Sequence, residues 1–227
     1  MRYKVVYQFK WLLIIAFIIL VYLSNFILIE LPFIRIHFPE KDVSKGLFVF
    51  LLSFFPRFSF EFQIYNIQTV IAWVSGVALG ARIGAVALCI YLAFGFIGLP
   101  IFASGGGFDY YKEPTFGYLI SLPINAFLSG WFFEKKQRVL AAFVPMFTTH
   151  LLGILYLFLF RQSWLDISWH ISFSMISYDL IFALLLTPIM PTISFVLNEM
   201  FAQEVPVRSL YSSEGGLEVN RQRIIKN

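Results

Sequence analysis

The chain has 227 residues, of which 59% are hydrophobic and 13% are charged, and its formal net charge is +4. Soluble domains carry about 45–50% apolar and about 25% charged residues, so this composition indicates a membrane protein. The basic residues stand at the ends of apolar segments and form no basic stripe, which argues against nucleic acid as a partner. The single cysteine, Cys89, excludes an intramolecular disulfide and a Cys-x-x-Cys metal site.

The first apolar segment extends over residues 11–29 and follows the basic residues Arg2, Lys4 and Lys10. Basic residues followed by an apolar run also describe a signal peptide. This run is about 19 residues long, enough to span a bilayer, and it has no small-residue cleavage site. We therefore expect it to be a retained membrane span.

Five further segments have the length and apolarity of membrane-spanning helices, namely residues 64–81, 83–101, 117–133, 139–160 and 172–197. Thr187-Pro188 and Pro191 stand in the second half of the last segment, where we expect the helix to bend or stop. We predict an all-α fold, a polytopic bundle of six transmembrane helices within residues 1–202. Five or seven spans are also compatible with this pattern.

Two segments lie outside the predicted spans: one connects the first span to the second, and the other follows the last span. The connection over residues 30–62 contains an apolar run, Gly46–Phe55, that is too short to span a bilayer. It is typical of an interfacial or re-entrant segment, or of a lid over the outer face. Residues 203–227 are polar, and we expect them to form a disordered tail.

The distribution of Lys and Arg predicts the orientation in the membrane. With the N-terminus inside, eleven of these residues lie on the inner side and six on the outer side. Inner loops are enriched in Lys and Arg. We therefore expect a multi-pass protein of the bacterial plasma membrane, in contact with lipid, with both termini in the cytoplasm.

The most unusual stretch is the glycine-rich segment of residues 98–118, GLPIFASGGGFDYYKEPTFGY. Gly105, Gly106 and Gly107 lack the Cβ atom, so their backbone N–H groups can approach a ligand closely. A flexible surface turn is the alternative interpretation. No Gly-Lys-Ser/Thr follows, which excludes a phosphate-binding loop and ATP hydrolysis by this chain.

Polar residues within the predicted spans are candidate binding residues. Asp179 lies near the outer end of the sixth span, where a carboxylate costs about 2.5–3.5 kcal/mol and requires a partner. It is read as an acceptor for N–H groups of a ligand, or as a structural link to a neighbouring helix. Asn66 and Gln68 open the second span, either as ligand contacts or as helix-start residues. For His150 in the fifth span, a hydrogen-bonded packing role is favoured over a proton relay.

Small residues recur at every fourth position along the second span and its hairpin. Gly76, Gly80 and Gly84 form two overlapping small-xxx-small steps, which indicate close helix packing. The neighbouring helix can belong to this chain or to a partner. The sequence contains no His-Glu-x-x-His and no Gly-x-Ser-x-Gly motif, so we predict neither an enzyme nor a bound metal or cofactor.

Residues 98–131 resemble the BioY family, the biotin-specific S components of energy-coupling factor (ECF) transporters, and the resemblance covers about residues 64–133 well and the fifth and sixth spans weakly. The matching residues are Gly98, Leu99, Pro100, Phe102, Ala103, Gly105 to Gly107, Pro114, Thr115, Gly117 and Tyr118. Upstream, Ile67-Gln68-Thr69 and the segment 79–84 resemble the second span of that family and its turn.

The resemblance implies a membrane subunit that binds biotin in an outward-facing cavity and mediates its uptake. A separate T component and ATPases would supply the energy in trans. By position, Asp179 looks like the family's aspartate for the ureido ring of biotin. Gly105 to Gly107 look like the substrate loop, and Tyr118 looks like the tyrosine that closes the motif.

Three positions depart from the family pattern. Phe182 stands where the family often has Lys, Gly106 where some members have Asn, and Leu119 where some members have Arg. The cation expected near the carboxylate of biotin is therefore missing, and Lys112, Arg161 and His170 are the candidate replacements. Two alternatives stay open: an S-type subunit for another vitamin or heterocycle, and a membrane scaffold without transport activity.

Overall fold

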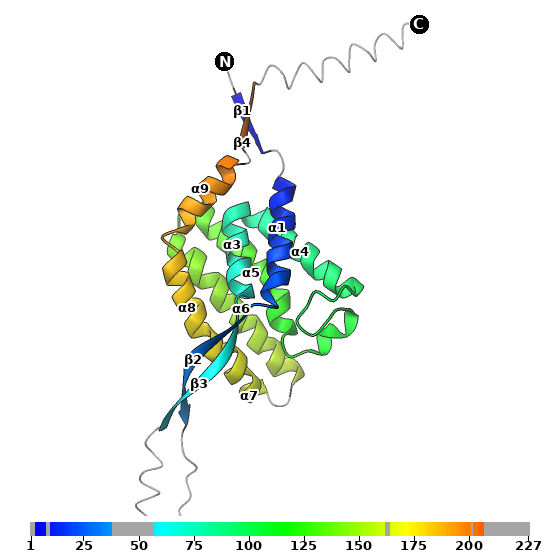
Figure 1. Ribbon diagram of the computed structural model, residues 1–227, viewed down its shortest axis with the longest axis vertical. Helices are drawn as coiled ribbons and strands as arrows, with labels where there is room; N and C mark the ends of the chain where they lie inside the picture. The colour runs from blue at the N-terminus through cyan, green and yellow to red at the C-terminus, as the bar shows by residue number, and fades with distance from the viewer. Residues whose placement is uncertain (1–2, 8–9, 38–56, 162–163, 201, 207–227) are drawn as a thin grey trace, which may run out of the picture.

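The computed structural model describes residues 3–7, 10–37, 57–161, 164–200 and 202–206. Within these residues the chain forms a bundle of helices with a short two-stranded ribbon at each end (Figure 1). The principal helices are α1 (Lys10–Ser24), α3 (Gln68–Leu79), α4 (Ala81–Ile97), α5 (Phe116–Glu134), α6 (Arg138–Phe160), α8 (Ser174–Leu186) and α9 (Met190–Met200). The predicted all-α membrane bundle is confirmed.

Six apolar helices of the described chain correspond to the six predicted spans. Three are long and apolar enough to cross a membrane, namely α5, α6 and the continuous helix Trp169–Leu186. Three are shorter, Trp11–Ser24, Gln68–Leu79 and Ala81–Ile97. The helix Trp169–Leu186 combines a π-helical turn, η3 (Trp169–Phe173), with α8, and a short helix, α7 (Trp164–Ser168), precedes it.

The sixth predicted span is broken where its prolines predicted a break. The chain turns over residues 187–189 and resumes as α9, with Pro191 as the second residue of that helix. Proline is tolerated in the first turn of a helix because the N–H group that it lacks has no partner there. The prediction of a bend at Thr187-Pro188 is therefore confirmed, although the predicted segment extended through it.

The first two spans are shorter than predicted because side chains end the helices early. Helix α1 stops at Ser24, whose Oγ donates to the carbonyl of Val21 at 2.6 Å. Asn25 donates through Nδ2 to the carbonyl of Tyr22 at 3.2 Å. Such local bonds compete with helix continuation. At the start of the second span, strand β3 continues to Asn66, whose side-chain oxygen accepts from the N–H of Gln68 at 2.9 Å, so this helix begins at Gln68 rather than at residue 64.

The connection between α1 and α3 contains two strands that the sequence analysis did not predict. Strand β2 (Leu28–His37) pairs antiparallel with β3 (Arg57–Asn66), from Leu28 opposite Asn66 to His37 opposite Arg57. The apolar run Gly46–Phe55, predicted as an interfacial segment or lid, lies outside the described residues.

A second ribbon joins the two ends of the described chain at the opposite end of the bundle (Figure 1). Strand β1 (Tyr3–Tyr7) pairs antiparallel with β4 (Ala202–Pro206). Residues 203–206 are therefore part of a strand, whereas a disordered tail was expected from residue 203. The remainder of that tail, residues 207–227, lies outside the described residues.

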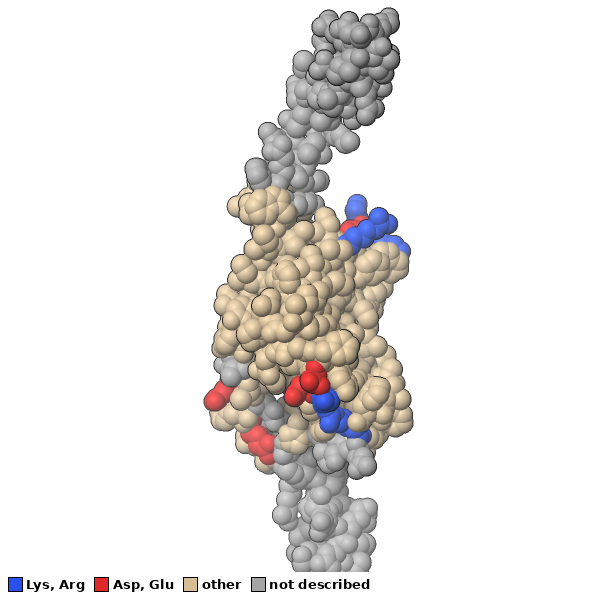
Figure 2. Space-filling model, turned by 90° about the vertical axis from the view of Figure 1, so that its right-hand side faces the viewer, with Lys and Arg blue, Asp and Glu red and all other residues tan. Residues whose placement is uncertain are grey.

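The outer surface of the bundle is apolar between its two ends. Figure 2 shows charged side chains gathered near both ends, with a belt free of Lys, Arg, Asp and Glu between them on the face in view. Large apolar side chains point outward from the helices, for example Leu151 at 66% and Leu184 at 63% exposure. A soluble protein would bury such side chains, whereas a bilayer surrounds them with hydrocarbon.

Helix α5 lies against α3, α4 and α6, and glycines allow the closest of these approaches. A Cβ atom on Gly76 of α3 would lie 2.0 Å from the carbonyl oxygen of Ala126 in α5. A Cβ atom on Gly84 of α4 would lie 2.8 Å from the Cα of Gly76. The predicted role of these glycines in close helix packing is confirmed, and the neighbours belong to this chain.

We predict that Gly76→Ala destabilises the bundle by about 1–3 kcal/mol, because the added methyl group forces α3 away from α5. Thermal unfolding of the purified protein in detergent measures this change. Val86→Ala, on the outward face of α4, is the matched control and should unfold near the wild-type temperature. Equal stability of Gly76→Ala and wild type would contradict the tight contact.

Candidate functional site

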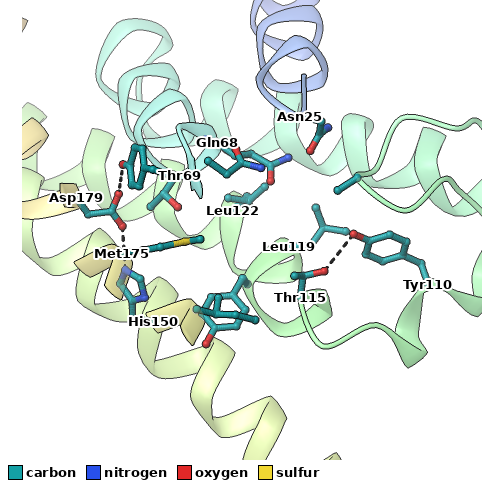
Figure 3. Close-up of a pocket in the computed structure, with 15 residues that line it drawn as sticks. Asn25, Gln68, Thr69, Tyr110, Thr115, Leu119, Leu122, His150, Met175 and Asp179 are labelled. Carbon is teal, nitrogen blue, oxygen red and sulfur yellow. Dashed lines mark hydrogen bonds and ion pairs between the residues drawn. The ribbon is translucent and has the colours of Figure 1, made fainter. Parts of the chain in front are cut away.

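The bundle encloses a cavity of about 110 Å³ between its helices and the glycine-rich segment. Residues from β3, α3, α5, α6, η3 and α8 contribute to its wall, together with Asn25, which follows α1, and the segment between α4 and α5. The lining residues are Asn25, Tyr65, Asn66, Gln68, Thr69, Ala103, Tyr110, Thr115, Tyr118, Leu119, Leu122, His150, Ile171, Met175 and Asp179. Figure 3 shows Asp179 and His150 at one end and Asn25, Tyr110 and Thr115 toward the other.

At one end of the cavity, a buried carboxylate is held by two neighbours. Asp179 in α8 is 4% exposed, and its Oδ1 accepts a short hydrogen bond from the hydroxyl of Tyr65 in β3. Its Oδ2 lies 2.9 Å from Nε2 of His150 in α6. A carboxylate only accepts, so the hydroxyl and the ring nitrogen donate. The side chain of Asp179 therefore joins β3, α6 and α8, which are distant in sequence.

The partners of Asp179 leave it able to bind a ligand. Two carboxylate oxygens offer about four lone-pair positions, and Tyr65 and His150 occupy one on each oxygen. Because Asp179 also lines the cavity, its remaining acceptor capacity can meet N–H groups of a bound molecule. The two roles considered from the sequence, ligand acceptor and structural link, are compatible in this geometry.

The middle of the cavity is apolar. Leu119 and Leu122 of α5 and Met175 of α8 lie between the two polar ends (Figure 3). Tyr118 lines the wall beside His150, with the two ring centroids 6.2 Å apart, and its hydroxyl is 2.5 Å from Oγ of Ser172. This part of the site suits an apolar ring or chain rather than a polar group.

At the other end, a network of neutral side chains is organised by Tyr91 of α4. The Tyr91 hydroxyl donates to the carbonyl oxygen of Ile101 at 3.0 Å. It lies 3.2 Å from Nδ2 of Asn25 and 3.1 Å from Nε2 of Gln68. Asn25 also donates to the carbonyl of Ile101 at 2.9 Å. The network therefore connects α1, α3 and α4 to the start of the glycine-rich segment.

The glycine-rich segment folds back on α4 and covers this end. The ring of Phe102 packs directly on Gly95, where a Cβ atom would lie 1.9 Å from the ring. Backbone bonds join Phe102 and Gly105 at 2.9 and 3.0 Å. Gly107 donates to the carbonyl of Gly95 at 2.7 Å, and a Cβ atom on Gly106 would lie 2.0 Å from the carbonyl oxygen of Leu99.

The three consecutive glycines therefore shape the loop rather than line the cavity. Gly105 and Gly107 adopt φ values of +106°, which L-residues with a side chain rarely adopt. The segment faces the cavity through Ala103, Tyr110 and Thr115. Tyr110 is buried, which raises the pKa of its hydroxyl, and this hydroxyl is 3.2 Å from Oγ1 of Thr115.

The candidate residues from the sequence fall into three groups. Asp179, Tyr118, Asn66 and Gln68 line the cavity, whereas Gly105, Gly106 and Gly107 support the loop above it. Lys112 is not part of the lining. Its Nζ lies 2.6 Å from Oδ1 of Asp109, and both side chains are largely exposed. Asp109 raises the pKa of Lys112 through this hydrogen bond.

Several lining residues were not predicted as site residues. Asn25 follows Ser24 as one of two polar residues in an otherwise apolar run, which was an available signal. Tyr65 and Tyr110 were not distinguishable by type, since aromatic residues are abundant throughout the chain, whereas His150, one of three histidines, was expected to have a hydrogen-bonded packing role. In the described part of the chain, neither Arg161 nor His170 lines the cavity.

The fold defines the chain as a polytopic helical membrane protein with a cavity between its helices. The sequence profile of the BioY family matches residues 46–199. This match covers more than half of the chain, which therefore belongs to the BioY family.

Individual relatives agree with this assignment. "Probable biotin transporter BioY" of Lysinibacillus sphaericus is 31% identical over 113 residues, 46% of this chain and 58% of the relative. "Probable biotin transporter BioY" of Pyrococcus horikoshii is 31% identical over 121 residues, 52% of this chain and 74% of the relative. "Biotin transporter BioY" of Rhodobacter capsulatus is 33% identical over 125 residues, 52% of this chain and 66% of the relative. These matches thus cover between 58% and 74% of the length of the relatives.

A solved structure has the same fold. It is the crystal structure of the S-component for biotin from an ECF-type ABC transporter, with a TM-score of 0.55. The match covers 79% of this chain and 87% of that chain, at 20% sequence identity. The likeness establishes the helical arrangement of the bundle.

We predict that Tyr65→Phe destabilises the fold by about 1–3 kcal/mol, because it removes a donor from a buried carboxylate. Thermal unfolding in detergent is again the measurement. Tyr111→Phe is the matched control, since Tyr111 is partly exposed and its hydroxyl has no hydrogen-bond partner among the described residues. Equal losses for both variants would contradict a special role of the Tyr65 hydroxyl.

Proposed function

We propose that this protein binds biotin in the cavity beside Asp179 and mediates its uptake as the S component of an ECF transporter. The observation that carries the proposal is the acceptor end formed by Asp179 with Tyr65 and His150, next to an apolar middle section. Membership of the BioY family and the names of the relatives support the same ligand.

The chemistry of biotin fits this arrangement of polar and apolar groups. Biotin has a ureido ring with two N–H donors, a fused sulfur-containing ring and a flexible apolar chain that ends in a carboxyl group. Asp179 supplies the acceptor for a ureido N–H, and a carboxylate acceptor strengthens such a bond. The sulfur ring and the chain then lie along Leu122, Met175 and Leu119, away from water.

The proposed transport cycle requires partners that this chain does not contain. The sequence has no phosphate-binding loop, so the energy would come from separate ATPases acting through a T component. The proposed orientation places both termini in the cytoplasm and the β2–β3 ribbon on the outer side. The location of the two ribbons at opposite ends of the bundle is compatible with this orientation.

Binding of radiolabelled biotin to the purified full-length protein tests the proposed ligand. We expect saturable binding, and we expect Asp179→Asn to weaken it about 10- to 100-fold, because a hydrogen bond to a charged group contributes about 1.5–3 kcal/mol. Asp109→Asn is the matched control, since Asp109 is exposed and lies outside the cavity. It should bind biotin as the wild type does.

Two results would contradict the assignment. An Asp179→Asn variant with wild-type affinity would remove Asp179 from the site. A folded wild-type protein without biotin binding would instead favour another vitamin or heterocycle, which competition with other vitamins would identify.

Uptake by whole cells tests the proposed mechanism. We expect cells that produce this chain together with a T component and its ATPases to accumulate labelled biotin faster than cells that produce the chain alone. One control is cells in which the ATPase lacks its functional phosphate-binding lysine. The other is cells that produce the T component and the ATPases but not this chain. Equal uptake with and without active ATPases would contradict energising in trans.

A further inference from the structure

The end of the bundle that carries the β1–β4 ribbon also carries a cluster of basic side chains. Its four members stand where helices begin or end, namely Arg82, Lys135, Lys136 and Arg138. Figure 2 shows Lys and Arg gathered at this end, beside the belt that is free of charged side chains. All four side chains are exposed, and none forms an ion pair with another described residue. The cluster therefore presents positive charge to its surroundings.

Glu134 is the only acidic residue in the two turns that hold this cluster, residues 79–83 and 131–140. Its Oε1 accepts from the N–H of Ala81 at 3.1 Å, and this bond joins the end of α5 to the start of α4. Arg82 is therefore held next to the turn in which the other three cations stand. Four cations and one carboxylate give the cluster a net charge of +3.

A groove of about 460 Å³ lies between α4 and α5 at the edge of the cluster. Its walls combine one cation with apolar side chains, and the lining residues are Leu79, Gly80, Ala81, Arg82, Ile83, Phe127, Trp131 and Glu134. The ammonium group of Lys135 lies 3.4 Å from the centroid of the Trp131 ring. Attraction between a cation and an aromatic face keeps this second charge beside the groove. The groove is therefore cationic toward the end of the bundle and apolar toward its middle.

The apolar part of the groove continues into the surface that faces lipid. Ile120, Ile124, Phe127 and Trp131 are spaced four, three and four residues apart, so they lie on one face of α5. Each of these side chains is 38–41% exposed. This stripe belongs to the apolar belt of the bundle, so a hydrocarbon chain that lies against it can enter the groove without crossing water.

We propose that this groove binds an anionic phospholipid, with the phosphate between Arg82 and Lys135 and one acyl chain along Phe127 and Trp131. A guanidinium group matches the geometry of a phosphate with paired N–H donors, and an ammonium group adds a point charge. Basic pockets beside membrane helices bind anionic headgroups in this way. A zwitterionic lipid carries its own ammonium group, which the net positive charge of the cluster repels. A soluble phosphate would leave the apolar walls uncovered.

The proposed lipid site is separate from the cavity beside Asp179. The two share no lining residue, so the inference does not depend on which molecule occupies that cavity. The phosphate would contact residues on both sides of the bond between Ala81 and Glu134. A bound lipid would therefore fasten the start of α4 to the end of α5.

Quenching of tryptophan fluorescence by brominated lipids tests the site on the purified full-length protein in nanodiscs. Bromine atoms on an acyl chain quench the tryptophans that the chain contacts. The nanodiscs consist of phosphatidylcholine with a small fraction of brominated phosphatidylglycerol or, in parallel, of brominated phosphatidylcholine with the same chains. We expect phosphatidylglycerol to quench more strongly at equal fraction. We expect this excess to vanish in Trp131→Phe, which removes the reporter in the groove.

Removal of the two cations tests the headgroup contact. We expect the double variant Arg82→Gln and Lys135→Gln to require about 10- to 30-fold more phosphatidylglycerol for the same excess quenching, because each Lys or Arg near an anionic surface contributes about fivefold in affinity. The double variant Lys112→Gln and Arg161→Gln is the matched control, since it removes two cations at the opposite end of the bundle. It should respond as the wild type does. Thermal unfolding in detergent shows whether each variant is folded.

Two results would overturn the lipid site. Equal quenching of the wild type by the two brominated lipids would leave the basic cluster to an acidic surface of a protein partner. An excess that persists in Trp131→Phe, or that is unchanged when Arg82 and Lys135 are both replaced, would place the anionic lipid elsewhere on the bundle.

Discussion

The close approach of α3 to α5 determines the geometry of the bundle. Gly76 brings the backbone of α3 against the carbonyl of Ala126, and Gly130 of α5 lies against the start of α4 in the same way. In a bilayer, lipid tails are as apolar as the side chains, so helices associate through such tight packing rather than through the hydrophobic effect. Because α5 also contacts α6, these contacts set the separation of the helices around the cavity.

The parts of this fold that follow from simple periodicities were predictable. Six apolar helical segments, the break at Thr187-Pro188 and the packing role of Gly76 and Gly84 all follow from local composition. The two ribbons were missed, although β3 contains a signal, since apolar and polar residues alternate over residues 57–64. That alternation was outweighed by the expectation that a membrane protein is helical throughout. The pairing partners of the strands are distant in sequence, and no local pattern identifies them.

The candidate site was predictable only in part, because contacts between residues distant in sequence leave no local pattern. Asp179 is recognisable because a carboxylate in an apolar segment is costly and therefore has a role. The hydrogen-bonded packing role expected for His150 is confirmed by its contact with Asp179, but the partner was not predicted. Tyr65 is one of eleven tyrosines, and its importance arises only where β3 meets α8. Lys112 was nominated for its charge, yet Asp109 lies three residues earlier and pairs with it. The glycines of the loop were expected to face the ligand, but the N–H groups of Gly105 and Gly107 donate to the carbonyls of Phe102 and Gly95 and complete the fold of the loop itself.

The bond from Tyr91 to the carbonyl of Ile101 has a consequence for the motion of the site. Ile101 lies at the start of the glycine-rich segment, and the same carbonyl holds Asn25 of α1. If the segment moves away, Tyr91 regains a free proton and the amide of Asn25 loses the neighbour that orients it. The position of the segment and the orientation of the Asn25 amide beside the cavity are therefore thermodynamically coupled. A ligand that contacts this amide in its observed orientation favours the observed position of the segment, so that ligand binding and the position of the segment are one equilibrium.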